Sequence, residues 1–301
     1  MSGVPPTFAH LLGRWSLDPV LTAGLTFAGG LYALGIMRVR HRRFGTRRRS
    51  GWSGWRAASF AAGLATIALA LESGVDAIGD GELLSVHTAQ HMLLALLAPT
   101  LLLYGAPVRL ALAAGSRKTR ARIVATLSSA PVRELTRPAI GCLLFAIVML
   151  VTHLRVVFEA ALEDPTLHAF EHAAYFWSGV ALLAPLIAAD PLPRAPGALA
   201  RFCWLMGAMT AMAIPGALLT FSEGVSYPFY LAPARVLGRS ALGDEHLAGA
   251  IMWVGGGVAM FALALCIAFG AMVEEERRQR RRERYSRDIA AEPWPAEAVR
   301  S

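Results

Sequence analysis

The chain has 301 residues, of which 55% are hydrophobic and only 17% are charged, and its formal net charge is +8. Several apolar runs exceed the roughly 20 residues that cross a bilayer, which excludes an ordinary soluble domain and predicts an all-α integral membrane protein. In a soluble protein the basic excess would suggest nucleic-acid binding. Here the arginines gather between the apolar runs, so we expect the lipid bilayer as the surroundings and no nucleic-acid partner.

Hydropathy predicts a polytopic bundle of about seven transmembrane helices, which together form a single domain over residues 1–273. Segment 274–301 follows as a basic cytoplasmic tail, which should extend the last helix and rest near anionic lipid. The expected spans, in chain order, are 18–37, 55–72, 83–104, 138–158, 166–189, 201–221 and 247–273.

The basic residues predict the orientation. The connections 38–54, 105–137 and 190–200, the tail and two span starts hold 25 of the 29 Lys and Arg residues, whereas the other side holds four. Positively charged loops stay in the cytoplasm, so we expect the N-terminus outside, the C-terminus inside and the protein in the cell membrane.

The outer connections are acidic or aromatic instead. Asp76, Asp80 and Glu82 precede the third span. Such acids attract cations, although acids are also tolerated outside the membrane without any function. In the longest outer connection, the aromatic cluster Tyr227–Tyr230 predicts an anchor at the level of the lipid headgroups.

Histidines fall at one depth in this topology. At 3.6 residues per turn, His87 and His91 lie on one helix face about 6 Å apart. A second pair of the same spacing, His168 and His172, opens the fifth span with Glu171 between its members. With two further histidines, six are expected in the outer half of the membrane: His87, His91, His153, His168, His172 and His246.

This concentration of imidazoles favours a metal site. A lone histidine in a membrane helix is often only a hydrogen-bonding partner, but ionisable groups there are costly and usually functional. Imidazole suits Zn, Cu, Fe and Ni, and nearby thioethers tilt the choice slightly toward Cu(I). The candidate metal ligands are His87, His91, His153, His168 and His172. Residues that could orient these ligands or add to them are Gln90, Met92, Met149, Glu171, Asp244 and His246.

Four motifs resemble a known family. They are His87-x-x-Gln90-His91-Met92 followed by Pro99 and Gly105-x-Pro107; His168-x-x-Glu171-His172 with His153 upstream and Gly179 downstream; Pro215-Gly216; and Asp244 followed by Ala248-Gly249-x-x-Met252-Trp253. Over roughly 80–255 the chain thus resembles the cytochrome c oxidase assembly factors of the CtaG type. Where the family pattern has glutamine after the aspartate, this chain has Glu245, and His246 is not a family position.

The resemblance implies a copper-binding assembly factor, not an enzyme, that delivers copper to the CuB site of the oxidase catalytic subunit. Its copper ligands would be the histidines that match the family. Two alternatives stay open from the residues alone: a haem-binding membrane electron carrier, and a transporter of metal ions or protons. A homo-oligomer also stays open.

Overall fold

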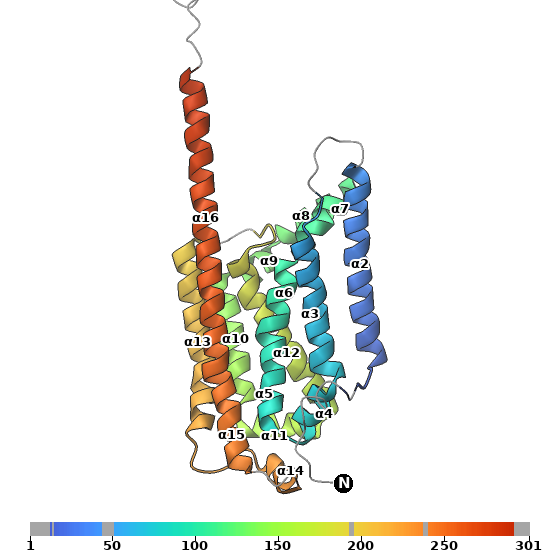
Figure 1. Cartoon of the computed structure of the whole chain (residues 1–301), viewed down its shortest axis with the longest axis vertical. Coiled ribbons are helices and arrows are strands. Elements are labelled where there is room, and N and C mark those ends of the chain that lie inside the picture. Colours follow the sequence, from blue (N-terminus) through green and yellow to red (C-terminus); the bar gives the residue numbers. More distant parts are fainter. Residues whose placement is uncertain (1–12, 14, 44–50, 193–195, 237–239, 292–301) are drawn as a thin grey trace, which may run out of the picture.

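The computed structural model describes residues 13, 15–43, 51–192, 196–236 and 240–291. Within these residues every regular element is a helix, which confirms the all-α prediction (Figure 1). Five long helices run roughly side by side: α2 (Pro19–Arg43), α3 (Gly54–Glu72), α10 (Pro138–Thr152), α12 (Pro165–Ile187) and α13 (Ala198–Thr220).

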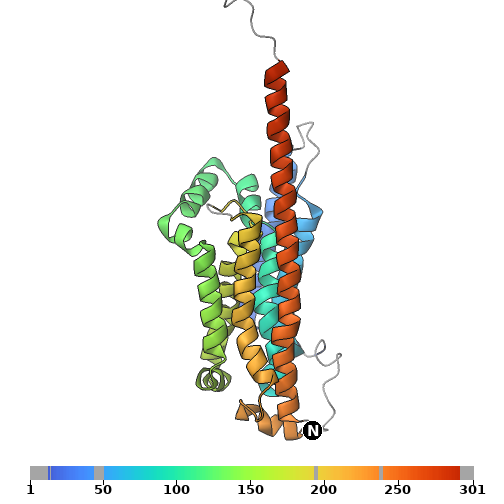
Figure 2. The same ribbon diagram turned by 90° about the vertical axis from the view of Figure 1, so that its left-hand side faces the viewer.

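Two further columns of the bundle are composite (Figures 1 and 2). In each, a short π-helical segment joins two α-helices, a distortion that is frequent at functional sites. The first column consists of α5 (Leu84–Met92), η1 (Leu93–Leu97) and α6 (Ala98–Tyr104). The second consists of α15 (Ala241–Ala250), η3 (Ile251–Gly255) and α16 (Gly256–Ala291).

The number of membrane-spanning helices stays a prediction. Among the described residues, five segments are long and apolar enough to cross a membrane, and six if the bent pair α10 and α11 (Arg155–Glu163) counts as one. α12 is not among them because its histidines and glutamate lower its hydropathy. The expected fourth span, 138–158, is not one straight helix: α10 ends at Thr152, and α11 leaves it at 77°.

Short helices occupy both ends of the bundle. At one end α7 (Pro107–Ala114), α8 (Arg117–Leu127) and α9 (Ala130–Leu135) fill the expected connection 105–137. At the other end lie α4 (Gly74–Gly81), α11, η2 (Pro228–Tyr230) and α14 (Leu231–Val236).

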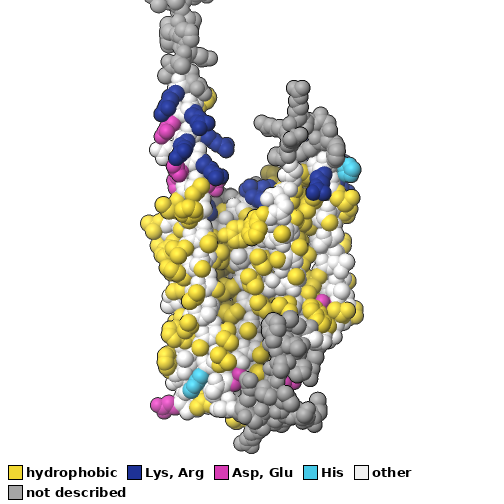
Figure 3. All heavy atoms as spheres, in the orientation of Figure 1, with side chains coloured by type: hydrophobic (Ala, Val, Ile, Leu, Met, Phe, Trp, Pro, Cys, Tyr) yellow, Lys and Arg dark blue, Asp and Glu magenta, His cyan; other side chains and the backbone are white. Residues whose placement is uncertain are grey.

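Charges separate along the bundle as the sequence predicts. In Figure 3 the Lys and Arg side chains gather beyond one end of a hydrophobic band. Apart from the acids on the protruding part of α16, most of the Asp and Glu side chains lie at the other end. We call these the arginine-rich end and the acidic end. Which of them faces the cytoplasm stays a prediction from the arginine count.

A close helix contact joins α12 to the column formed by α5, η1 and α6. α12 packs against η1, where a Cβ on Gly179 would collide with the carbonyl oxygen of Ala95. Small residues allow such approaches between membrane helices. The side chains of Leu94, Phe145, Tyr175 and Leu182 fill the core around this contact.

The aromatic cluster 227–230 is not the expected headgroup anchor. Tyr227 and Tyr230 are only 2% and 3% exposed. The hydroxyl of Tyr227 donates to the backbone carbonyl of His153 at 2.9 Å, and that of Tyr230 donates to the carbonyl of Gly79 at 2.8 Å. Buried phenols need such partners, so these hydrogen bonds hold the loop against the acidic end of the bundle.

Candidate metal centre

Helix α5 supplies the first histidine pair. His87 and His91 lie one turn apart, are 1% and 2% exposed, and have ring centroids 4.1 Å apart. Directly after Met92 the helix widens into η1, so the pair lies just before the π-helical turn. The i, i+4 spacing predicted from the sequence therefore places both rings on the inward face.

Helix α12 supplies the second pair. Its start is fixed by Asp164, whose carboxylate accepts hydrogen bonds from the backbone N–H groups of Thr166 and Leu167. These bonds also lower the pKa of Asp164. A start at Pro165 places His168 in the first turn and His172 in the second, with ring centroids 4.3 Å apart.

The two pairs meet. Ring centroids are 5.4 Å apart for His87 and His168, and also 5.4 Å apart for His91 and His172. One ligand atom from each of His87, His91, His168 and Glu171 lies within 4.8 Å of the other three. We call these four residues the histidine cluster. The convergence that a sequence cannot show is therefore present in the fold.

Several buried polar atoms of this region have no hydrogen-bond partner among the described residues. They include Nε2 of all four histidines of the two pairs and Oε1 of Glu171. Buried polar atoms are nearly always paired, and each exception needs an explanation. Neutral imidazole nitrogens without a partner are suitable ligands for a soft or borderline metal ion, so the residues fit such an ion.

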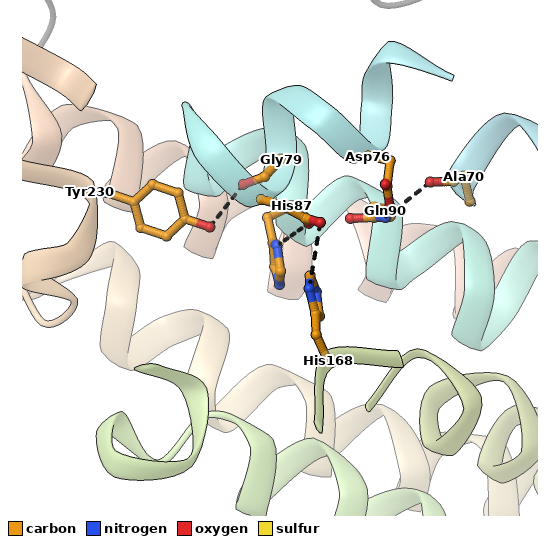
Figure 4. A network of polar contacts seen from close by, with 8 residues as sticks. Ala70, Asp76, Gly79, His87, Gln90, His168 and Tyr230 are labelled. Atoms are coloured by element: carbon orange, nitrogen blue, oxygen red, sulfur yellow. Dashed lines mark hydrogen bonds and ion pairs between the residues drawn. The ribbon is translucent and has the colours of Figure 1, made fainter. Parts of the chain in front are cut away.

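Asp80 of helix α4 also contacts the cluster, although its place in the sequence predicts only an outer connection. Its carboxylate oxygens lie 3.3 Å from Nδ1 of His87 and 3.5 Å from Nδ1 of His168 (Figure 4). With His168 and His172 it forms a second group of converging ligand atoms. Burial raises the pKa of Asp80 to about 6, although His168 acts in the opposite direction.

The approach of α4 depends on a glycine. A Cβ on Gly79 would lie 3.0 Å from the backbone of His87, so a larger residue would push α4 away from α5. The acidic stretch before the third span was the only sequence signal for Asp80. Nothing in that stretch indicates that it folds back onto the histidines.

Gln90 fixes the orientation of α5. Its amide nitrogen donates to the carbonyl of Ala70 at 3.0 Å and to the carboxylate of Asp76 at 2.7 Å (Figure 4). The side chain therefore points toward α3 and α4, not into the histidine cluster. Its role is to position the helix that carries His87 and His91.

His153 is not one of the converging ligands. It caps the C-terminus of α10, and its Nδ1 lies 2.8 Å from the carbonyl oxygen of Met149. The phenol oxygen of Tyr175 lies 3.5 Å from the same nitrogen, and the tyrosine ring lies tilted against the ring of His91 at a centroid distance of 4.1 Å. Tyr175 thus lies between His153 and the cluster.

The remaining predicted residues lie apart from the cluster. Met149 is fully buried in the hydrophobic core, and the sulfur of Met92 lies beside Gly256 of α16. Asp244 accepts hydrogen bonds from the backbone and the hydroxyl of Ser85, at 3.2 and 2.5 Å. His246 contacts the carbonyl of Ser222 at 2.9 Å. These contacts position α15.

The family follows from a comparison over most of the chain. The model of the cytochrome c oxidase caa3 assembly factor family matches residues 30–274. The chain belongs to this family. The match includes α5, α12 and the whole histidine cluster, and it confirms the resemblance that the motifs indicate.

Curated relatives come from mycobacteria. An uncharacterized protein of Mycobacterium bovis is 30% identical over 287 residues, which cover 92% of this chain and 42% of that protein, and one of Mycobacterium tuberculosis matches equally. An uncharacterized protein of Mycobacterium leprae is 28% identical over 257 residues, covering 83% of this chain and 38% of that protein. The chain thus spans less than half the length of these relatives. No solved structure matches the chain.

Proposed function

We propose that this assembly factor binds Cu(I) as cargo at the histidine cluster and delivers it to the CuB site of the oxidase catalytic subunit. The observation that supports the proposal is the convergence of three imidazoles and Glu171 within 4.8 Å, with unpaired ligand atoms. Delivery is a binding and release process, so no catalytic residue is assigned.

The donor set favours Cu(I) on chemical grounds. Cu(I) prefers imidazole, thiolate and thioether ligands to carboxylates. We therefore assign the ion to His87, His91 and His168 and give Glu171 the role of orienting a ring. Imidazole binds metal only in its neutral form, so occupancy is expected to fall only at a pH acidic enough to protonate these buried rings.

Release to a partner requires ligand exchange. His168 belongs both to the histidine cluster and to the group with Asp80 and His172. An ion held by the first set can therefore move toward the second while His168 stays bound. In the proposed topology this exchange takes place in the outer half of the cell membrane, with the oxidase catalytic subunit as the acceptor. Whether the chain forms a homo-oligomer stays open.

The proposal is tested in cells whose own gene for this chain is deleted. These cells express a supplied copy of the wild type, of His87→Ala or of His168→Ala. His246→Ala is the matched control, because its ring bonds Ser222 and lies outside the cluster. The oxidase is purified from each strain, and its copper and haem contents and its activity are measured. We expect both cluster variants to yield oxidase with haem but with less CuB, partly restored by added copper. Fully loaded, active oxidase from both variants would refute the proposal.

A further inference from the structure

A second polar site lies at the arginine-rich end, opposite the histidine cluster. There a cavity of about 510 Å³ opens between the ends of α3, α6, α7, α12 and α13 and the middle of α16. Four arginines from four different helices line it, together with two carboxylates: Arg56, Arg109, Arg201 and Arg278, with Asp190 and Glu274. Formally the lining carries two more positive than negative charges.

Both carboxylates already have partners. Asp190 accepts the backbone N–H groups of Val108 and Arg109, at 3.3 and 2.7 Å, where α7 begins. Glu274 accepts a hydrogen bond from Arg278 at 2.7 Å. Both acidic side chains of the cavity are therefore already engaged, Asp190 by backbone N–H groups and Glu274 by one of the arginines.

The arginines of the cavity differ in how far their guanidinium groups are already hydrogen-bonded. Arg201 donates to the carbonyls of Pro196 and Leu186, at 2.7 and 3.2 Å. Arg56 lies over the ring of Trp52, 5.5 Å from its centroid, and its buried Nη1 has no hydrogen-bond partner. Arg56 and Arg109 are close enough to repel one another, and the single carboxylate of Asp190 attracts both of them. A buried guanidinium nitrogen without an acceptor is costly, and an anion would offset that cost.

The backbone is strained at the same place. Among the described residues, the two non-glycine residues with positive φ are Ala106 (50°) and Ala188 (48°). Ala106 turns the chain into α7, which carries Arg109, and Ala188 ends α12 just before Asp190. Such conformations are costly for residues with a side chain, and they cluster at functional sites. Here they bring Arg109 and Asp190 to one cavity.

We propose that this cavity binds a phosphate group, carried either by an anionic phospholipid or by free phosphate. Guanidinium groups bind phosphate through paired, charge-assisted hydrogen bonds, and Arg56 and Arg109 are the donors available here. Trp55, at the rim, is 70% exposed. Tryptophan is enriched at the membrane interface, which places the cavity at headgroup level beside the apolar helices.

The test uses the purified full chain in a neutral detergent. Its thermal unfolding is followed during titration with phosphatidylglycerol, with phosphatidylcholine and with inorganic phosphate. The variants are Arg56→Gln and Arg109→Gln, and Arg122→Gln is the matched control because that arginine is exposed on α8 outside the cavity. We expect stabilisation of the wild type and the control by phosphatidylglycerol, and about tenfold weaker affinity in the two cavity variants.

The arms distinguish the two phosphate sources. Stabilisation by inorganic phosphate that is weakened in both cavity variants identifies a free phosphate ligand, and a response to phosphatidylglycerol alone identifies the lipid. An equal response in the wild type and both cavity variants overturns the proposal. If the variants do not fold, the wild type is labelled with a photoreactive phosphatidylglycerol. Crosslinks at Trp55, Arg56 or segment 104–109 support the site, and crosslinks confined to other regions refute it.

Discussion

At the residue scale, Asp80 is the side chain that links the two histidine helices. Its carboxylate contacts His87 of α5 and His168 of α12 from a third helix, α4. A carboxylate in contact with a ligating imidazole fixes the ring and raises its basicity, and its loss typically costs 10–100-fold in metal affinity.

We therefore expect Asp80→Asn to raise the Kd for Cu(I) by roughly 10–100-fold without changing the number of ions bound. Competition with a chromogenic Cu(I) chelator measures this Kd. Glu163→Gln is the control, because Glu163 is an exposed carboxylate at the same end of the bundle. An Asp80→Asn variant with wild-type Kd would mean that Asp80 does not support the metal ligands.

Asp76 predicts a pH dependence of stability. Burial, helped by the neighbouring Asp80 carboxyl, raises the pKa of Asp76 to about 6 against the hydrogen bond from Gln90. The folded state therefore favours the protonated carboxyl. This stabilisation is fully present below the ordinary pKa near 3.8 and is lost as the pH rises through about 6.

Asp76→Asn should remove this loss of stability at higher pH, because asparagine is uncharged and can still accept the hydrogen bond from Gln90. We expect the variant to be more stable than the wild type near pH 7.5 by on the order of 1 kcal/mol, discounted for partial exposure. The gain should shrink toward pH 4.5. Thermal unfolding at both pH values measures it, and a gain that is equal at both would contradict the raised pKa.

At the element scale, the sequence predicts local periodicity better than helix packing. The pairs on α5 and α12 are visible because a spacing of four places two rings on one helix face. Helix α4 is not visible, because eight residues that include three glycines carry no clear helical signal. The sequence alone therefore predicts Asp80 in an outer connection and not beside the histidines.

The same limit applies to His153, which the sequence groups with the converging histidines. Continuous hydropathy extends the fourth span past this residue, but the helix ends at Thr152 and the next one leaves at 77°. His153 consequently caps a helix and lies behind Tyr175. The tyrosines of segment 227–230 look like interfacial anchors in the sequence because their buried partners are backbone carbonyls of distant residues, which have no sequence signature.

The contact between α12 and η1 can be tested at Gly179. In Gly179→Ala the added methyl group meets the carbonyl of Ala95, so α12 must move away from the column that carries His87 and His91. Overpacking of this kind costs about 1–3 kcal/mol. We expect a lower thermal midpoint together with weaker Cu(I) binding.

Gly30→Ala is the matched control, since nothing lies within 4 Å of a Cβ at that position of α2. It should leave both quantities unchanged or raise stability slightly, because alanine is the better helix former. Equal effects of the two substitutions would show that the contact between α12 and η1 does not hold the cluster.

At the scale of the whole molecule, the separation of charge predicts how the bundle crosses the membrane. The arginine-rich end contains α8 and the basic part of α16, and the acidic end contains the histidine cluster. Because basic segments stay in the cytoplasm, the cluster should face outward.

We expect a reporter that works only in the cytoplasm to be active when it is fused after Ala291, and an exported phosphatase fused there to be inactive. Fusions within the connection between η2 and α15 should give the reverse pattern. The opposite result at both positions would place the histidine cluster on the cytoplasmic side and contradict delivery from outside.

The most direct measurement is the copper content of the anaerobically purified chain, wild type beside His91→Ala and His172→Ala, with His246→Ala as the control. His91 is a proposed ligand, and His172 belongs to the group that shares His168 with the cluster. We predict about one to two copper atoms per chain in the wild type and the control, loss of copper in His91→Ala and a lower copper content in His172→Ala. Full copper content in both variants would show that the converging imidazoles of α5 and α12 do not hold the ion.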